Sequence, residues 1–254
     1  TKTASVPTVA MVNGDFSQVS TTIKDPLTGQ AFPGNIIPAN RISKVGQAIA
    51  KYYPKPVLSD PVRNFVSTPV DRRNIDQVTG RLDHRISDKN NIFGRYSFNN
   101  DTENDPFDAY NGISNLPDYG RLDDQTATSI SIVDTHIFTP RLVAEFRLGY
   151  NRYTQSRFEV HHTQNIPALL GITGTSQDPI DWGFPAVFAT NYETLGKNGL
   201  PTDRQDNAYQ FIANLTRTSG NHTLKGGTDI QWMQSNRLNN SNSLGVYRFT
   251  GQYS

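Results

Sequence analysis

The stretch DQVTGRLDHRISDKNNIFGRYSFN (residues 76–99) contains two runs of alternating apolar and polar residues, joined by a tight polar turn at 87–90. In the first run Leu82 falls on one face and Arg81 on the other, and the second run continues the alternation through Tyr96. A period of two residues is typical of β-strands, because successive side chains point to opposite sides. The stretch therefore predicts a β-hairpin with one apolar face and one charged face.

The same plan is repeated along the chain, and short turns join the strands within each hairpin. We expect hairpins over residues 76–100, 126–155 and 207–236, and a further strand over 245–254. Long polar loops at 101–125 and 156–206 connect the hairpins. Together these segments predict an all-β, antiparallel up-and-down sheet of about seven strands, with its short turns at one end and its long loops at the other.

This asymmetry of the connections decides between two β architectures. A soluble β-sandwich also alternates apolar and polar side chains, but compact soluble domains favour short connections at both ends. Outer-membrane barrels have short periplasmic turns and long extracellular loops. The pattern therefore favours a transmembrane β-barrel segment, with Leu82, Ile86, Ile92, Tyr96 and Phe98 facing lipid. In the sandwich alternative the aromatic side chains fill a core; in the barrel they form an interfacial girdle near the long loops, namely Tyr96, Phe98, Tyr150, Tyr153, Tyr209, Phe211 and Trp232.

Residues 1–75 are rich in Pro, Gly, Asn, Asp and Ser, and their Asp-Pro, Pro-Gly and Thr-Gly pairs are turn signals. We expect a long structured loop region here, with few strands. One short helix is predicted over 44–53, because Ser43 can cap it and apolar residues follow at helical spacing. Pro54 prevents the helix from continuing. The loop region should therefore pack around one short helix.

The composition excludes several classes of protein. The 254 residues carry a formal net charge of +1, which argues against a nucleic-acid partner, and the absence of Cys excludes disulfides and thiolate metal sites. No run of 18 apolar residues occurs, so no transmembrane helix is expected. The chain starts at Thr1 without a signal peptide, and we interpret it as a fragment or a processed product.

Several segments in this order resemble the barrel portion of TonB-dependent outer-membrane receptors, specifically the Oar-like group with a carboxypeptidase-regulatory-like domain. They are VPTVAMVNGDFS (6–17), DPLTGQAFPGNIIPANRIS (25–43), KYYPKP (51–56), GRLDHRISDKNNIFGRYSF (80–98), TPRLVAEFRLGYNR (139–152) and GNHTLKGGTDIQW (220–232). The resemblance implies a barrel of about 22 strands with an internal plug. It also implies the bacterial outer membrane as location, lipid and the TonB complex as partners, the latter through the plug, and an extracellular ligand. Neither a plug nor a TonB box is recognisable here.

Charged residues on the polar faces of the predicted strands form the first candidate site. In a barrel they face the lumen, where they pair across strands or contact a ligand; in a sandwich they form a solvated face. The predicted lumen-facing residues are Arg81, Asp83, Arg85, Arg95, Glu145, Arg147, Lys225 and Asp229.

Two loops supply further candidates. Asp101, Glu103, Asp105 and Asp108 place four carboxylates within eight residues, which suggests either a calcium site or an ordinary solvated loop, since the EF-hand pattern is missing. Apart from this calcium, no cofactor is expected. The loop 156–206 contains aromatic residues that either build a small loop core or stack on a glycan or peptide ligand: Trp182, Phe184, Phe188 and Tyr192.

Motifs for catalysis are missing from the sequence. It contains no GxSxG, no HExxH and no phosphate-binding loop, so an enzyme is not expected. The leading interpretation is a segment of a TonB-dependent receptor that takes up or recognises a ligand. The alternative is a soluble or surface-exposed all-β binding module that uses the aromatic loop 156–206.

Overall fold

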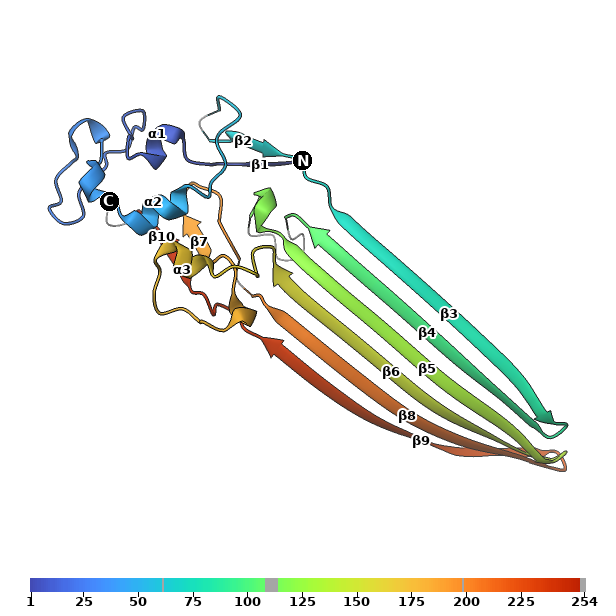
Figure 1. Cartoon of the computed structure of the whole chain (residues 1–254). Helices are drawn as coiled ribbons and strands as arrows, with labels where there is room; N and C mark the ends of the chain where they lie inside the picture. The colour runs from blue at the N-terminus through green and yellow to red at the C-terminus, as the bar shows by residue number, and fades with distance from the viewer. Residues whose placement is uncertain (61, 108–113, 198, 252–254) are drawn as a thin grey trace.

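A computed structural model describes residues 1–60, 62–107, 114–197 and 199–251 of the chain. A long antiparallel sheet of six strands dominates the molecule, and shorter elements gather at one end of it (Figure 1). The six strands are β3 (Arg72–Ser87), β4 (Asn90–Asp105), β5 (Arg121–Thr139), β6 (Leu142–Glu159), β8 (Thr202–Ser219) and β9 (His222–Asn239). They lie in the order β3-β4-β5-β6-β8-β9, so every neighbour in space is also the next long strand in sequence.

The shorter elements are two-stranded ladders, short α-helices and single 3-10 turns. They are β1 (Lys2–Ala4), α1 (Val9–Val12), α2 (Lys44–Ala50), β2 (Phe65–Ser67), α3 (Ile166–Leu170), β7 (Ala186–Ala189), β10 (Val246–Phe249), and the 3-10 turns Pro33–Asn35, Ala39–Arg41, Pro117–Tyr119 and Pro179–Asp181. In α2 the hydroxyl of Ser43 accepts a hydrogen bond from the backbone N–H of Gly46, which confirms the predicted cap. The helix ends at Ala50, three residues earlier than predicted.

The sheet has one apolar face and one polar face. Across five strands the register aligns Tyr96, Ile130, Tyr150, Tyr209 and Trp232 in one row on the apolar face. The ring centroids of Tyr150 and Tyr209 are 5.0 Å apart, and those of Tyr209 and Trp232 are 5.2 Å apart. We call these five side chains the aromatic row.

The aromatic row marks the upper boundary of the apolar band. Between the hairpin turns and the row, this face carries residues such as Phe146, Phe211 and Leu224. The eight steps from Leu224 to Trp232 cover about 27 Å along the strand, or roughly 20 Å of height for a strand tilted by about 40°. Tyr153, expected in the girdle, points to the opposite face, because it is an odd number of positions from Tyr150.

Beyond the aromatic row the strands continue, and apolar side chains such as Phe98 and Phe158 are scattered among polar ones. The strands have 16 to 19 residues, whereas the predicted hairpins end near 100, 126, 155 and 207. As a result the loop expected over 101–125 shrinks to 106–120, and the one over 156–206 to 160–201. The predicted loop boundaries were therefore wrong by several residues.

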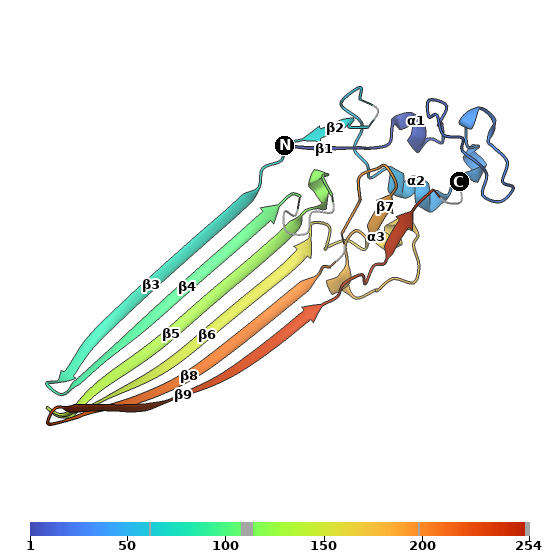
Figure 2. The ribbon, with the colours of Figure 1, turned by 180° about the vertical axis from the view of Figure 1, so that it is seen from behind.

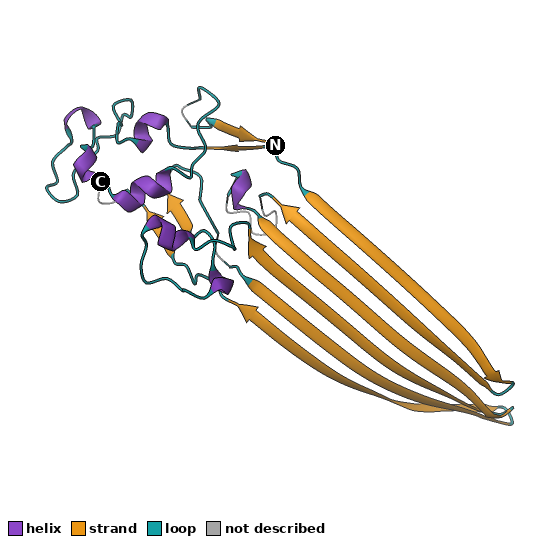
Figure 3. Cartoon of the chain, viewed as in Figure 1, coloured by secondary structure: helices purple, strands orange, loops and turns teal. Residues whose placement is uncertain are grey.

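The described segments that flank the six long strands at the end away from the hairpin turns form one body, which we call the cap: 1–60, 62–71, 106–107, 114–120, 160–197, 199–201 and 240–251. All described helices belong to the cap, as Figure 3 shows, and the view from behind shows the same separation from the far end of the sheet (Figure 2). The cap has its own hydrophobic core, built from Ala4, Val6, Ile49, Leu116, Tyr119, Ile166, Leu170, Phe184, Val187 and Leu195. Residues from the first segment and from both long loops therefore fold together.

The expected seventh strand is not part of the long sheet. Instead β10 pairs in parallel with β7 inside the cap, Val246 opposite Ala186 and Phe249 opposite Ala189. Residues 252–254 of that expected strand lie outside the described residues. The long sheet thus has six strands, and among the described residues no strand covers the outer edges of β3 and β9.

No helix in the described part of the chain is long and apolar enough to cross a membrane.

Candidate functional site

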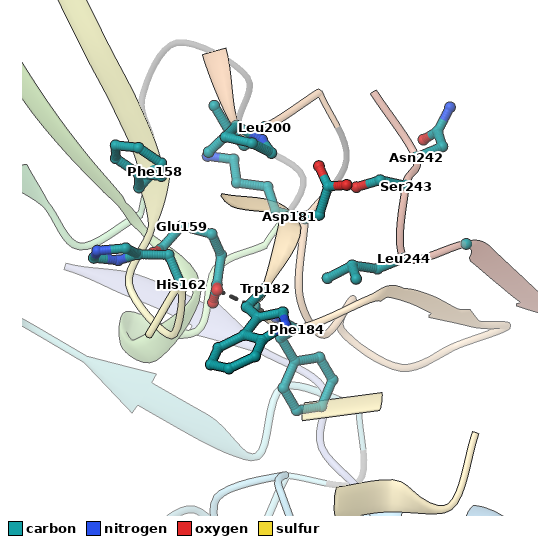
Figure 4. A pocket seen from close by; sticks show the side chains of 14 residues that line it. Phe158, Glu159, His162, Asp181, Trp182, Phe184, Leu200, Asn242, Ser243 and Leu244 are labelled. Carbon is teal, nitrogen blue, oxygen red and sulfur yellow. Dashed lines mark hydrogen bonds between the residues drawn. The ribbon is translucent and has the colours of Figure 1, made fainter. Parts of the chain in front are cut away.

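The cap encloses a narrow cavity where β6 ends. Phe158, Glu159 and His162 line it from one side, and Trp182 and Leu244 from others (Figure 4). Its free volume is about 20 Å³, room for roughly one water molecule. The indole Nε1 of Trp182 is buried without a hydrogen-bond partner among the described residues. A cavity of this size is too small for an organic ligand.

The Glu159 carboxylate links the end of β6 to the loop that contains Phe184. One carboxylate oxygen accepts hydrogen bonds from the backbone N–H of His161 (2.9 Å) and of Phe184 (3.1 Å). The other lies 2.6 Å from Nδ1 of His161. This hydrogen bond with the carboxylate raises the pKa of His161, although burial of the ring opposes the rise. A buried carboxylate satisfied by three donors fixes the cap loop on the end of β6.

Gly183 permits this contact. Its φ is +145°, a conformation that favours glycine, and a Cβ built there would lie 2.6 Å from the Glu159 carboxylate. A side chain at this position would push the carboxylate away from the backbone N–H of Phe184. The residue pair Gly183-Phe184 therefore lets the loop bind the Glu159 carboxylate. We call the contacts of this carboxylate with His161 and Phe184 the Glu159 clasp.

Two more ionisable groups line the cavity. Lys197 is buried, and this burial lowers its pKa to about 8, while the charge of Asp105 opposes the decrease. Asp181 is buried as well, but it accepts hydrogen bonds from the Ser176 hydroxyl (2.6 Å) and the Asn240 side chain (2.8 Å). The bond with Asn240 joins the loop before β7 to the segment after β9 and so links two walls of the cavity.

Above the aromatic row, the polar face of the sheet carries a network of ion pairs. The pairs are Arg73–Asp101 (2.5 Å), Arg121–Glu103 (3.0 Å), Arg157–Asp123 (2.8 Å) and Arg204–Asp206 (2.5 Å). Asp123 is 1% exposed, and it also lies 3.7 Å from the guanidinium of Arg121. The first three pairs join neighbouring strands, whereas Arg204 and Asp206 both lie on β8.

Along the long strands, an apolar band lies near the hairpin turns and a network of ion pairs lies nearer the cap. A family model described as an outer membrane beta barrel domain matches residues 1–254. The chain belongs to this family. No curated protein matches it.

This outer membrane beta barrel chain is therefore located in the bacterial outer membrane, as the sequence predicted. In barrels of this kind an apolar band faces the hydrocarbon, an aromatic girdle lies at its boundary, and the long loops are extracellular.

The register places the eight predicted lumen-facing residues on one face of the sheet, opposite the apolar band. Asp83, Arg147 and Asp229 lie in one row across the strands, and Arg81 stands directly opposite Arg95. Local pairs occur between Arg81 and Asp83, between Arg85 and Asp88, and between Arg147 and Glu145. That this face lines a lumen stays a prediction, because the described sheet is open.

Most of the acidic cluster lies in a strand rather than in a loop. Asp101, Glu103 and Asp105 belong to β4, and Asp108 lies outside the described residues. Asp101 pairs with Arg73, and Glu103 pairs with Arg121. The Asp105 carboxylate accepts a hydrogen bond from the backbone N–H of Phe107. The described residues contain no group of three or more His, Cys, Asp or Glu side chains placed to hold a metal ion. Calcium binding thus stays a prediction, in competition with these arginines.

The four aromatic candidates do not converge on one site. Phe184 belongs to the cap core and is 1% exposed, and Trp182 lines the narrow cavity. Phe188 lies under the guanidinium of Arg248 at 4.1 Å, and the Tyr192 hydroxyl contacts the sulfur of Met11. The arrangement corresponds to the loop-core alternative for Phe184; ligand stacking by the other three stays a prediction.

Proposed function

We propose that this chain is part of a TonB-dependent, Oar-like receptor barrel that recognises an extracellular ligand and takes part in its uptake, without catalysis. The observation that supports this most is the contrast along the strands. An apolar band ends at the aromatic row, and above it the strands continue as a polar wall that carries an ordered cap. A wall and cap of this size on the extracellular side suit ligand capture better than a simple pore.

The open edges of the sheet support a larger barrel. Both β3 and β9 are exposed along their length, and their outer backbone groups have no strand partner among the described residues. Lipid does not tolerate unpaired strand edges, so we propose that further strands close the barrel. The proposed partners are therefore outer-membrane lipid, the TonB complex through a plug region, and an extracellular ligand; nucleic acid is not among them.

Affinity capture tests the dependence on TonB. The natural full-length protein is solubilised from outer membranes and passed over an immobilised periplasmic domain of TonB from the same bacterium. We expect saturable retention that excess soluble TonB domain competes away. A protein that is folded, as shown by its heat-modifiable mobility, but is not retained would overturn the TonB-dependent role and leave surface recognition through the cap.

A further inference from the structure

A second, wider cavity lies on the polar face of the sheet, just below the cap. Its volume is about 420 Å³, and its walls come from β5, β6, β8, β9 and the segments next to β8 and β9. Four arginines line it, one from each strand, and no lining residue is acidic: Arg121, Arg157, Arg204 and Arg237. A cavity with this lining is strongly cationic.

Neighbouring carboxylates neutralise the arginines only in part. Asp123 lies close to both Arg121 and Arg157, and Glu103 pairs with Arg121. Asp206 pairs with Arg204. These carboxylates lie outside the lining of the cavity, whose four guanidinium groups each carry five N–H donors.

The arginines on β8 and β9 show the imbalance most clearly. Arg204 and Arg237 stand directly opposite each other in the β8–β9 ladder, where like charges destabilise a sheet. Asp206 is already bonded to Arg204 and to the hydroxyl of Ser235 (2.6 Å). Arg237 is exposed and forms no ion pair with any residue that the structure describes, although its charge acts on Asp206 from a longer distance. An anion in the cavity would relieve this repulsion.

The position of the cavity excludes lipid headgroups as its occupant. Arg204 and Arg237 lie five positions beyond Tyr209 and Trp232 of the aromatic row, on the side away from the turns. Five positions is an odd number, so they face the opposite side of the sheet from the aromatic row. The cavity therefore opens above the membrane and away from lipid, toward solution.

We propose that this arginine cavity binds a soluble ligand that carries several phosphate or carboxylate groups. Guanidinium groups bind both kinds of anion through paired N–H donors, and a cluster of four favours a ligand with more than one anionic group. That the ligand arrives from the extracellular side rests on the proposed receptor function. Binding itself needs neither TonB nor energy.

Titration calorimetry on the natural full-length protein in detergent tests the proposal, with pyrophosphate and citrate as probes and sucrose as a neutral comparison. We expect saturable binding of at least one anion and none of sucrose. Raising the salt from about 50 to 300 mM should weaken binding, because the cavity is open to solvent. Arg237→Gln should weaken it about tenfold, the effect of removing one charged hydrogen-bonding group.

Arg152→Gln is the control. Arg152 is an exposed arginine on β6, five positions from Arg157, so its side chain points to the opposite face of the same strand. It lies outside the cavity, so its variant should bind within twofold of the wild type. The proposal is overturned if the wild type binds neither anion, or if both variants weaken binding equally. Failure of the TonB capture experiment would leave this outcome unaffected.

Discussion

The long sheet and the cap are stabilised in different ways. Large apolar side chains in the sheet are exposed, for example Leu82 (76%) and Trp232 (64%), whereas Phe184 and Leu195 of the cap are almost fully buried. Soluble proteins do not normally expose such a continuous apolar band. The sheet thus leaves its apolar band exposed, while the cap carries its own core. Perturbations should therefore affect the two regions separately.

The largest effect is expected from Phe184→Ala. The ring of Phe184 packs edge-to-face on Tyr52 at 4.8 Å and on Tyr119 at 5.3 Å. Removing a buried ring of this size costs about 3–5 kcal/mol. Hydrogen exchange followed by mass spectrometry should show faster exchange throughout the cap, with the strands below the aromatic row unchanged. Phe188→Ala, at a half-buried position, is the control and should have a smaller effect. Equal exchange in both variants would contradict an independent cap core.

The second effect concerns the sheet alone. Ala213 lies on the apolar band, about halfway between the β8–β9 turn and Tyr209. Ala213→Arg should cost about 2–4 kcal/mol, as expected for an arginine near the middle of the bilayer. Urea unfolding in lipid vesicles measures this cost. Gln210→Arg, on the opposite face beside Asp229, should cost less than about 1 kcal/mol. If both variants lose the same stability, the assignment of the two faces is wrong.

The hairpins could be predicted from the sequence because alternation extends through the apolar band. Above the aromatic row this signal ends, since residues such as Thr126 and Gln125 are polar on both faces. There the ladder continues through cross-strand contacts instead, including Thr126 with Thr154 (2.5 Å) and Tyr153 with Gln125 (2.9 Å). Periodicity carries no information about such contacts, so the predicted strands ended too early.

The same limitation hid the arginine cavity and the Glu159 clasp. Arg121 and Arg204 fell in predicted loops, so their common face could not be assigned. Glu159 and Phe184 are 25 residues apart in a loop without regular spacing, and only folding brings them together. A glycine next to an aromatic residue, as at Gly183, was the one local signal, and it is too common to identify a site.

The smallest effect tests how the cap is fastened to the sheet. Glu159→Gln keeps the shape of the side chain and one acceptor oxygen for the backbone N–H groups, but it removes the charge that the protonated ring of His161 binds. A hydrogen bond to a charged group is worth about 1.5–3 kcal/mol, so the variant should weaken the cap by about this amount at pH 6. Cap hydrogen exchange, corrected for the intrinsic pH dependence of exchange, measures the loss.

This fastening should depend on pH in one direction only. The pKa of His161 is raised in the folded cap, so the pair stabilises it fully below the unfolded pKa of about 6.5 and loses that contribution as the pH rises through the folded value. The wild-type cap should thus be more stable at pH 6 than at pH 7.5, a range that lies below the pKa of about 8 of the buried Lys197, and Glu159→Gln should remove most of this difference. His162→Gln should retain it, because His162 contacts the backbone carbonyl of Glu159 rather than its carboxylate. A pH dependence that persists in Glu159→Gln would assign it to another group in the cap.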